Sequence, residues 1–340
     1  MGTESELQAS VQALVQKGKG ILAADESAPT IAKRFAAIGL ESNEENRRAY
    51  RSLILGTPAL SDSISGVILF EETLMQRAND ATPLPQLGAR MGLVPGIKVD
   101  AGKIALALAP GDEITQGLDG LGKRLAGYKQ QGARFAKWRA VYNVTDTLPS
   151  RAAMQTNAHA LARYAAICQE QGVVPIVEPE VLIDGAHSLA RCAEVTQAVL
   201  HEVFQALFDQ RVVLEHLLLK TSMVLPGKAH AQAATPSEVA QATLRVLRRT
   251  VPAAVASINF LSGGQTPEQA SANLDAINRC GVQPWPLSFS YGRALLDPAL
   301  KAWGGQASRV RDGQSALLKR ARLNAAACQG RYETAMESSG

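Results

Sequence analysis

Eight short runs of apolar and β-branched residues, each ending in polar or charged side chains, constrain the fold of this chain more than any other feature. The runs lie at residues 20–27, 66–72, 96–100, 135–139, 174–180, 217–222, 257–264 and 287–293. The stretches between them have helical patterns, as at residues 152–171 and 189–209. Such strand–helix units predict an α/β fold of the closed (β/α)8, or TIM, barrel type. A doubly wound sheet would usually have fewer strands and a glycine-rich first turn.

We expect a single domain over residues 1–332, with a helix ahead of the barrel, and a short flexible tail at residues 333–340. The helix is indicated by the apolar positions Leu7, Val11 and Leu14. Thr3 and Glu6 match a capping box at its start. The chain has 340 residues, of which 46% are apolar, so one large barrel can bury a sizeable core.

Charge and hydropathy exclude several classes of partner. The net charge of +4 comes from 35 basic and 31 acidic residues scattered along the chain, so we expect no nucleic-acid partner. No apolar run approaches the roughly 18 residues that a membrane span needs, and the polar N-terminus lacks a signal-peptide pattern. The four cysteines lie far apart, without metal or redox spacing. These features predict a cytoplasmic protein with no membrane partner.

Polar residues at the ends of the predicted strands indicate where the site lies. In (β/α)8 barrels the functional groups sit at the C-terminal ends of the strands. Here those ends carry Asp25, Glu71, Lys98, Lys137, Arg139, Glu178, Glu180, Lys220, Ser262 and Arg293. A barrel that only had to be stable would not need an ionisable group at nearly every strand end. We therefore expect a shared polar mouth.

Three of these residues, Lys98, Lys137 and Lys220, are lysines. Partial burial and neighbouring positive charge both disfavour protonation of a lysine. Lowering a lysine pKa by about 3 units from about 10.4 requires roughly 4 kcal/mol. The resulting amine can attack a carbonyl at neutral pH, which is the requirement for Schiff-base catalysis. The strand ends alone leave open which lysine attacks.

Carboxylates near these lysines could transfer the protons that Schiff-base chemistry requires. Glu178 and Glu180 alternate on one strand, so both side chains point to the same side, and Asp25 ends the first strand. Charge balance for the lysines is the alternative role of all three.

Two glycine-bearing strand ends suit a phosphate group. Ser262-Gly263-Gly264 and Tyr291-Gly292-Arg293 follow the seventh and eighth strands, where barrels commonly bind phosphate through backbone N–H groups and arginine. A second anion could be held across the mouth by Lys98, Arg139, Ser27 and Thr30. A substrate phosphorylated at both ends would match this arrangement.

A series of longer sequence blocks carries a family resemblance. In chain order the blocks are GKGILAADES, EENRR, GVILFEETL, GIKVD, TQGLDGL, FAKWR, LARYA, VPIVEPE, LLLK, LRRTVP, FLSGGQ, FSYGRAL, LKAWGG and ACQG. With them the chain resembles the class I (Schiff-base) fructose-bisphosphate aldolases from about residue 7 to residue 332. The resemblance implies reversible cleavage of fructose 1,6-bisphosphate without a metal or another cofactor, in a homotetramer.

The resemblance also implies a role for each matching residue. Lys220 would form the Schiff base, Glu178 would be the acid–base residue, and Asp25 would position the substrate and assist cleavage. Lys137 would orient the C4 hydroxyl, and Glu180 would support Lys220. The C1 phosphate would be bound by Ser262, Gly263, Gly292 and Arg293, and the C6 phosphate by Ser27, Lys98 and Arg139, with Lys33 and Arg34 as weaker candidates.

Three departures from the family pattern keep alternatives open. Ala28-Pro29-Thr30 replaces Thr-Gly-Ser beside the C6-phosphate position, and Thr221 replaces proline after the lysine. The chain also lacks the long tail of the animal enzymes, which ends in a tyrosine that assists proton exchange. The alternatives are a Schiff-base aldolase for sedoheptulose bisphosphate or fructose 1-phosphate, a non-catalytic scaffold with this fold, and a metal-dependent aldolase.

Overall fold

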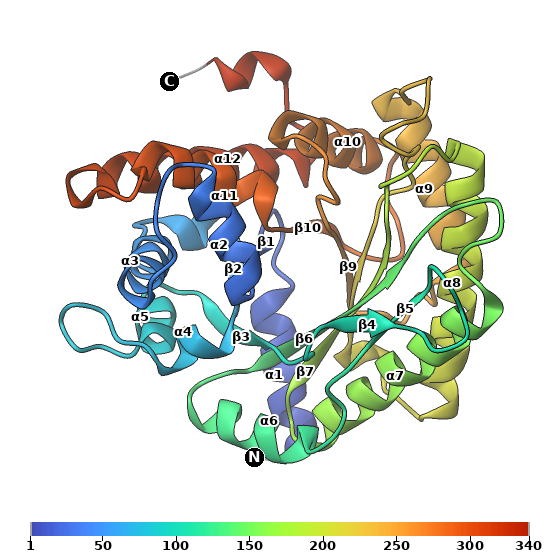
Figure 1. Ribbon diagram of the computed structural model, residues 1–340, viewed down its shortest axis with the longest axis horizontal. Helices are drawn as coiled ribbons and strands as arrows, with labels where there is room; N and C mark the ends of the chain where they lie inside the picture. The colour runs from blue at the N-terminus through green and yellow to red at the C-terminus, as the bar shows by residue number, and fades with distance from the viewer. Residues whose placement is uncertain (1, 339–340) are drawn as a thin grey trace.

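The computed structural model describes residues 2–338, and its centre is a closed barrel of parallel strands (Figure 1). The barrel strands are β1 (Gly20–Ala24), β2 (Ile64–Leu69), β3 (Val94–Lys98), β6 (Phe135–Tyr142), β7 (Val174–Val181), β8 (Leu218–Thr221), β9 (Ser257–Phe260) and β10 (Leu287–Tyr291). Their order around the barrel is β1-β10-β9-β8-β7-β6-β3-β2. The predicted (β/α)8 barrel is therefore confirmed, and each strand overlaps one predicted run.

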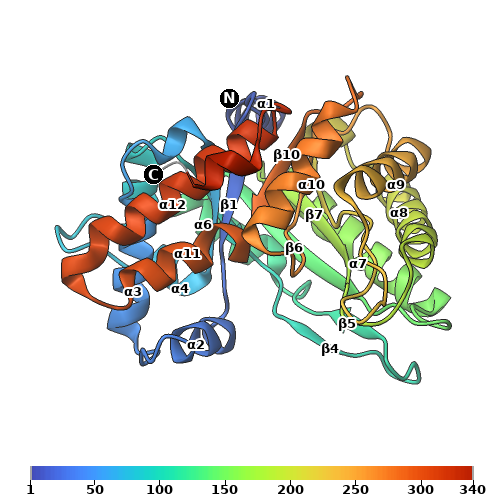
Figure 2. The ribbon, with the colours of Figure 1, turned by 90° about the horizontal axis from the view of Figure 1, so that it is seen from above.

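Helices surround the barrel and connect its strands, and they include the segments expected at residues 152–171 and 189–209 (Figure 2). They are α1 (Thr3–Leu14), α2 (Ala28–Ala36), α3 (Glu44–Leu55), α4 (Glu71–Met75), α5 (Leu84–Arg90), α6 (Leu121–Gln130), α7 (Arg151–Glu170), α8 (Leu189–Asp209), α9 (Pro236–Thr250), α10 (Pro267–Arg279), α11 (Arg293–Trp303) and α12 (Val310–Ala327). No helix within residues 2–338 is long and apolar enough to cross a membrane.

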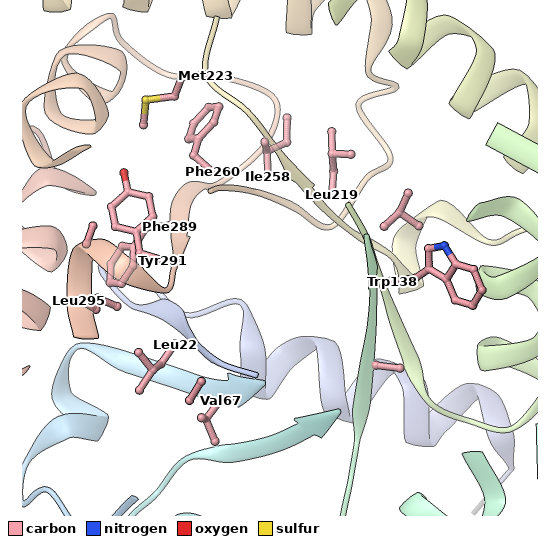
Figure 3. Close-up of a cluster of buried hydrophobic side chains, with 14 of the residues drawn as sticks. Leu22, Val67, Trp138, Leu219, Met223, Ile258, Phe260, Phe289, Tyr291 and Leu295 are labelled. Atoms are coloured by element: carbon pink, nitrogen blue, oxygen red, sulfur yellow. The ribbon is translucent and has the colours of Figure 1, made fainter. Parts of the chain in front are cut away.

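Alternation along each strand separates two apolar clusters. Leu219, Ile258 and Phe260 belong to the large cluster between the strands and the helices, part of which is drawn in Figure 3. Side chains that point to the other side of the strands, such as Ile176 and Leu218, fill the barrel interior toward its N-terminal end. Because Lys220 follows Leu218 by two residues, its side chain lies on the interior side of β8.

Helix α1 covers the N-terminal end of the barrel. Its Leu7 and Leu14 pack with interior strand residues, which closes this end and leaves the opposite end for a site. The capping box predicted for Thr3 and Glu6 is wrong. Gly2 is the N-cap without a side-chain hydrogen bond, and the Glu6 carboxylate lies 2.6 Å from Lys129 Nζ on α6. This tertiary ion pair takes the carboxylate away from the helix start.

A hairpin that the sequence analysis did not predict projects beside the mouth of the barrel (Figure 2). Its antiparallel strands are β4 (Lys103–Ala105) and β5 (Glu113–Thr115). Lys103 Nζ and Glu113 Oε2 lie 2.6 Å apart across it. Strands of three residues are too short to show a periodic pattern, which explains why the sequence did not reveal them.

The segment predicted as a flexible tail includes a short 3₁₀ helix, η4 (Thr334–Glu337), that packs beside α10 and α12. The Glu337 carboxylate accepts hydrogen bonds from Arg320 Nη1 at 2.6 Å and from the Tyr332 hydroxyl at 2.9 Å. The guanidinium of Arg320 also donates to the Pro267 carbonyl at 2.8 Å, at the start of α10. Residues 339–340 of the predicted tail lie outside the described residues.

Candidate active site

A cavity of about 1180 Å³ opens at the C-terminal ends of the barrel strands. The residues predicted as catalytic, Lys220, Glu178, Asp25, Lys137 and Glu180, all line it. The predicted substrate-binding residues, Ser27, Lys98, Arg139, Ser262, Gly263, Gly292 and Arg293, line the same cavity. The structure thus brings together side chains from strands far apart in the sequence, and their individual roles stay predictions.

A continuous chain of ion pairs runs through the deepest part of the cavity. Lys220 Nζ lies 3.1 Å from Glu178 Oε1, and Lys137 Nζ lies 3.3 Å from Glu178 Oε2. Lys137 Nζ also lies 2.7 Å from Asp25 Oδ2. Lys220, Glu178 and Lys137 are each less than 5% exposed. Glu178 therefore bridges two buried lysine side chains, while Asp25 pairs with Lys137 from the opposite side of the mouth.

The balance of charge differs from the sequence-based expectation for Lys137. Burial disfavours its charged form, but Asp25 and Glu178 outweigh burial and raise the pKa of Lys137 well above its usual value. Burial likewise opposes ionisation of Asp25, but Lys137 and Lys220 hold the pKa of that carboxyl well below its usual value. The prediction that crowding and burial favour a neutral lysine is thus wrong for Lys137, because each positive charge here has a carboxylate partner.

These shifts predict how stability depends on pH. The lowered pKa of Asp25 contributes stability that is complete above its unfolded pKa of about 3.9 and is lost as the pH falls toward the folded value. The raised pKa of Lys137 contributes stability that is complete below about pH 10.4 and is lost as the pH rises through the folded value. Asp25→Asn should therefore lower the free energy of unfolding by a constant amount between about pH 5 and pH 9. Urea titrations at several pH values test this, and a difference that disappears within that range would contradict the assigned pairing.

Two cationic groups of the rim, Lys98 and Arg139, are also paired. Lys98 Nζ lies 2.6 Å from Asp100 Oδ1 and donates to the Asp100 carbonyl at 2.8 Å. Arg139 forms an ion pair with Glu180, which raises the pKa of Arg139 against the effect of burial. Arg139 remains partly exposed to the cavity, so it can still reach an anion. An incoming phosphate would have to share these cations with their carboxylates.

Hydroxyl groups at the start of α2 face the same rim. Ser27 Oγ and Thr30 Oγ1 lie 3.1 Å apart, and both residues line the cavity. Ser27 is the N-cap of α2 without a side-chain cap bond, so its hydroxyl is available to a ligand. Pro29 lies in the first turn of the helix, where backbone N–H groups have no partner within the helix, so its missing N–H does not weaken α2. This explains why the helix still forms with Ala28-Pro29-Thr30 in this position.

The predicted C1-phosphate residues come from two adjacent strand ends. Ser262 and Gly263 follow β9, and Gly263 has a φ of +53°, a conformation that glycine adopts without strain. Gly292 is the N-cap of α11, and Arg293 begins that helix with its side chain exposed. The N-terminus of α11, the hydroxyl of Ser262 and the guanidinium of Arg293 together favour the binding of a phosphate dianion here.

Sequence reasoning missed several residues of the site. Asp100 pairs with Lys98, and the buried hydroxyl of Ser290 lines the cavity without a hydrogen-bond partner. Glu26, next to Asp25, accepts from Arg34 and lies 2.7 Å from Arg51 Nη2 on α3. Asp100 and Ser290 follow the inward parity of their strands and could have been found by that rule. The pairing of Glu26 with Arg51 has no local sequence signal.

The buried pair of Glu26 and Arg51 should be important for stability. Arg51 is 3% exposed, so Glu26→Gln would leave its charge buried without a carboxylate. We expect a loss of about 3–5 kcal/mol in the free energy of unfolding. Equilibrium urea unfolding measures it, with Glu45→Gln as the control, because Glu45 pairs with Arg48 at the surface and should matter by less than about 1 kcal/mol. Equal losses in the two variants would show that the buried pair has no special role.

A (β/α)8 barrel with buried lysines, carboxylates and cationic rims around one mouth has the architecture of a barrel enzyme for a small anionic substrate. A family profile described as class-I fructose-bisphosphate aldolase matches residues 6–340. The chain belongs to this class-I fructose-bisphosphate aldolase family.

Individual relatives agree with this assignment. A probable fructose-bisphosphate aldolase class 1 of Xanthomonas campestris is 52% identical over 96% of this chain and 98% of its own length. A fructose-bisphosphate aldolase of Drosophila melanogaster is 51% identical over 99% of this chain and 94% of its own. The solved aldolase of Plasmodium falciparum, in a ternary complex with TRAP and an inhibitor, is 48% identical, with a TM-score of 0.96 over 97% of this chain and 96% of its own.

Proposed function

We propose that this chain catalyses the reversible cleavage of fructose 1,6-bisphosphate into dihydroxyacetone phosphate and glyceraldehyde 3-phosphate, through a Schiff base on Lys220. The observation that carries the proposal is the position of Lys220, buried at a strand end with its Nζ 3.1 Å from Glu178 and within a mouth that is cationic on two sides. Family membership and the names of the relatives support the same reaction.

Imine formation uses the deep ion-pair chain. Lys220 first transfers a proton to the Glu178 carboxylate, and the resulting neutral amine attacks the C2 carbonyl and forms a carbinolamine. Glu178, in contact with Lys220, gives a proton to the departing hydroxyl, which leaves as water. The protonated imine then withdraws electrons from C2, as a Lewis acid would, so this step requires no metal.

Cleavage then breaks the C3–C4 bond. Glu178 or Asp25 takes the proton of the C4 hydroxyl, with Lys137 between them to orient that hydroxyl. The C3–C4 electron pair moves to C3 and forms an enamine, and glyceraldehyde 3-phosphate leaves. Protonation of C3 and hydrolysis of the imine release dihydroxyacetone phosphate and restore the Lys220 amine.

The two phosphates lie on opposite parts of the rim in this proposal. Ser262, Gly263, Gly292 and Arg293 bind the C1 phosphate, while Ser27, Lys98 and Arg139 bind the C6 phosphate. We expect fructose 1-phosphate to be cleaved more slowly than the bisphosphate, because it leaves the second set unused. Cleavage rates of fructose 1-phosphate, fructose 1,6-bisphosphate and sedoheptulose bisphosphate test this, and equal rates for the first two substrates would contradict a functional C6 site.

We further propose that the chain acts as a cytoplasmic homotetramer in glycolysis and gluconeogenesis. The family and a 52% identical relative named cytosolic in Arabidopsis thaliana support this placement. Analytical ultracentrifugation at micromolar concentration tests the oligomeric state, and a stable monomer would contradict it.

The reaction type is tested by reductive trapping. The protein is incubated with dihydroxyacetone phosphate and EDTA, reduced with borohydride, digested, and the modified peptide identified by mass. We expect one reduced adduct, on Lys220. An adduct on Lys98 or Lys137 would keep the chemistry and overturn the assignment of the lysine. Folded protein without any adduct would contradict the Schiff-base reaction.

A further inference from the structure

Asn259 of β9 lies beside Lys220, the lysine proposed to form the Schiff base. Neither Asn259 nor Ser257, its hydrogen-bond partner on β9, has a part in the mechanism above. Asn259 and Lys220 are direct register partners on the adjacent parallel strands β9 and β8. Neighbouring strands lie about 4.8 Å apart, and side chains of the same face stand next to each other. Because Ile258 and Phe260 pack toward the helices, Asn259 lies on the interior side, as Lys220 does.

Lys220 is thus flanked by two different groups. The carboxylate of Glu178, from β7, lies on one side, and the carboxamide of Asn259, from β9, lies on the other. Asn259 is 4% exposed, the same as Lys220. Below this layer the interior is mostly apolar, with Ile176 and Leu218 among its members.

The hydrogen bond of Ser257 fixes the orientation of this carboxamide. Ser257 Oγ donates to Asn259 Oδ1 at 2.7 Å, and both residues are buried. Across residues 2–338, this is the one side-chain hydrogen bond that Asn259 makes. Its oxygen is therefore occupied, while the Nδ2–H₂ group makes no hydrogen bond within these residues and keeps both of its donors.

We propose that Asn259 is a positioning residue that holds Lys220 as the unprotonated amine. The inference rests on the proposed function, since it assumes that Lys220 attacks the substrate carbonyl. An amide N–H can donate to the lone pair of a neutral amine, whereas an ammonium has no lone pair and turns its own N–H groups toward the amide. The carboxamide thus favours the nucleophilic form and opposes Glu178, which favours the ammonium.

Other charged groups of the mouth set the background for this effect. They are Asp25 and Glu26 after β1, Lys33 and Arg34 of α2, Glu71 at the start of α4, Lys98 of β3, Asp100 after it, Lys103 of β4, Asp119 before α6, Arg124 of α6, Lys137 and Arg139 of β6, Glu178 and Glu180 of β7, and Arg293 at the start of α11. The sequences of β9 and β10 contain no ionisable residue other than Tyr291, whose hydroxyl donates to the Ala270 carbonyl of α10. On the β9 side of Lys220, Asn259 is therefore the group that can influence protonation.

The test measures the rate of imine formation with dihydroxyacetone phosphate, by borohydride trapping on Lys220, in buffers from mildly acidic to alkaline pH. Asn259→Leu keeps the side-chain shape and removes the donors. We expect the midpoint of its pH profile to move upward by about 0.5–1 unit, which lowers the rate at neutral pH by about 3–10-fold. The rate should return to the wild-type value at alkaline pH. Asn259→Asp replaces the donors by a charge and should move the midpoint further in the same direction.

Two more variants separate this role from a structural one. Ser257→Ala frees the amide oxygen to accept from an ammonium, so its profile should also move upward. Thr221→Val is the control, because Thr221 follows Lys220 on β8 but faces away from it, and its buried hydroxyl has no partner. We expect the profile of Thr221→Val to equal that of the wild type, with thermal midpoints recorded for all variants.

The outcomes are distinct. A rate that falls by one factor at every pH in Asn259→Leu, or an unchanged profile, would overturn the inference and leave Asn259 a packing role. A midpoint that moves downward would also overturn it, because the amide would then present its oxygen to Lys220. Wild-type protein without an adduct on Lys220 would instead contradict the proposed function itself.

Discussion

Lys220→Arg is expected to abolish imine trapping and to lower kcat by at least about 10⁴-fold, a loss typical of removing a nucleophile. Arginine places a positive charge beside Glu178, so the ion-pair chain can persist. Its guanidinium stays protonated at every accessible pH and cannot attack the C2 carbonyl. The loss should therefore appear in kcat, with little change in substrate affinity.

The measurements are steady-state cleavage of fructose 1,6-bisphosphate and borohydride trapping. They are made on variants whose thermal midpoints match that of the wild type. Lys137→Met is the comparison variant, because Lys137 contacts the same carboxylate, Glu178, but is assigned no covalent role. It should still form the adduct, although more slowly. If Lys220→Arg retained trapping while Lys137→Met lost it, the roles of the two lysines would have to be exchanged.

The positions of the site residues could be predicted because they depend on strand parity and strand ends. Lys137 and Arg139 alternate on β6, and Glu178 and Glu180 alternate on β7, so their inward direction follows from the period of the strands. The closure of the barrel then brings every strand end to one mouth. For the same reason the predicted catalytic and phosphate-binding residues all line one cavity.

The partners of these residues could not be predicted in the same way. Arg51 reaches Glu26 from α3, which depends on how helices pack around the barrel and leaves no local pattern. The direction in which the pKa of Lys137 shifts depends on its distances to Asp25 and Glu178, and the sequence does not contain these distances. Asn259 shows the same limit, because its position beside Lys220 follows from the strand register.

Glu178→Gln is expected to lower kcat by about 10²–10⁴-fold, the usual contribution of general acid–base catalysis. The amide keeps the shape of the carboxyl group but cannot give a proton to the carbinolamine hydroxyl or accept one from C4–OH. Water loss from the carbinolamine should then limit the rate. The trapped adduct should therefore form more slowly than in the wild type, but still on Lys220. A loss of kcat with preserved adduct identity is therefore the signature of this residue, and it differs from the complete loss expected for Lys220→Arg.

The same substitution removes the carboxylate shared by two buried lysine side chains, since Lys220 and Lys137 both lie within 3.3 Å of it. Some loss of stability should accompany the loss of rate, so thermal midpoints must be measured beside kcat. Glu113→Gln is the matched control, because Glu113 pairs with a lysine on the exposed hairpin and should leave kcat near the wild-type value. If Glu178→Gln kept kcat within about tenfold of the wild type, a different group would have to move these protons, and Asp25 would be the next residue to test.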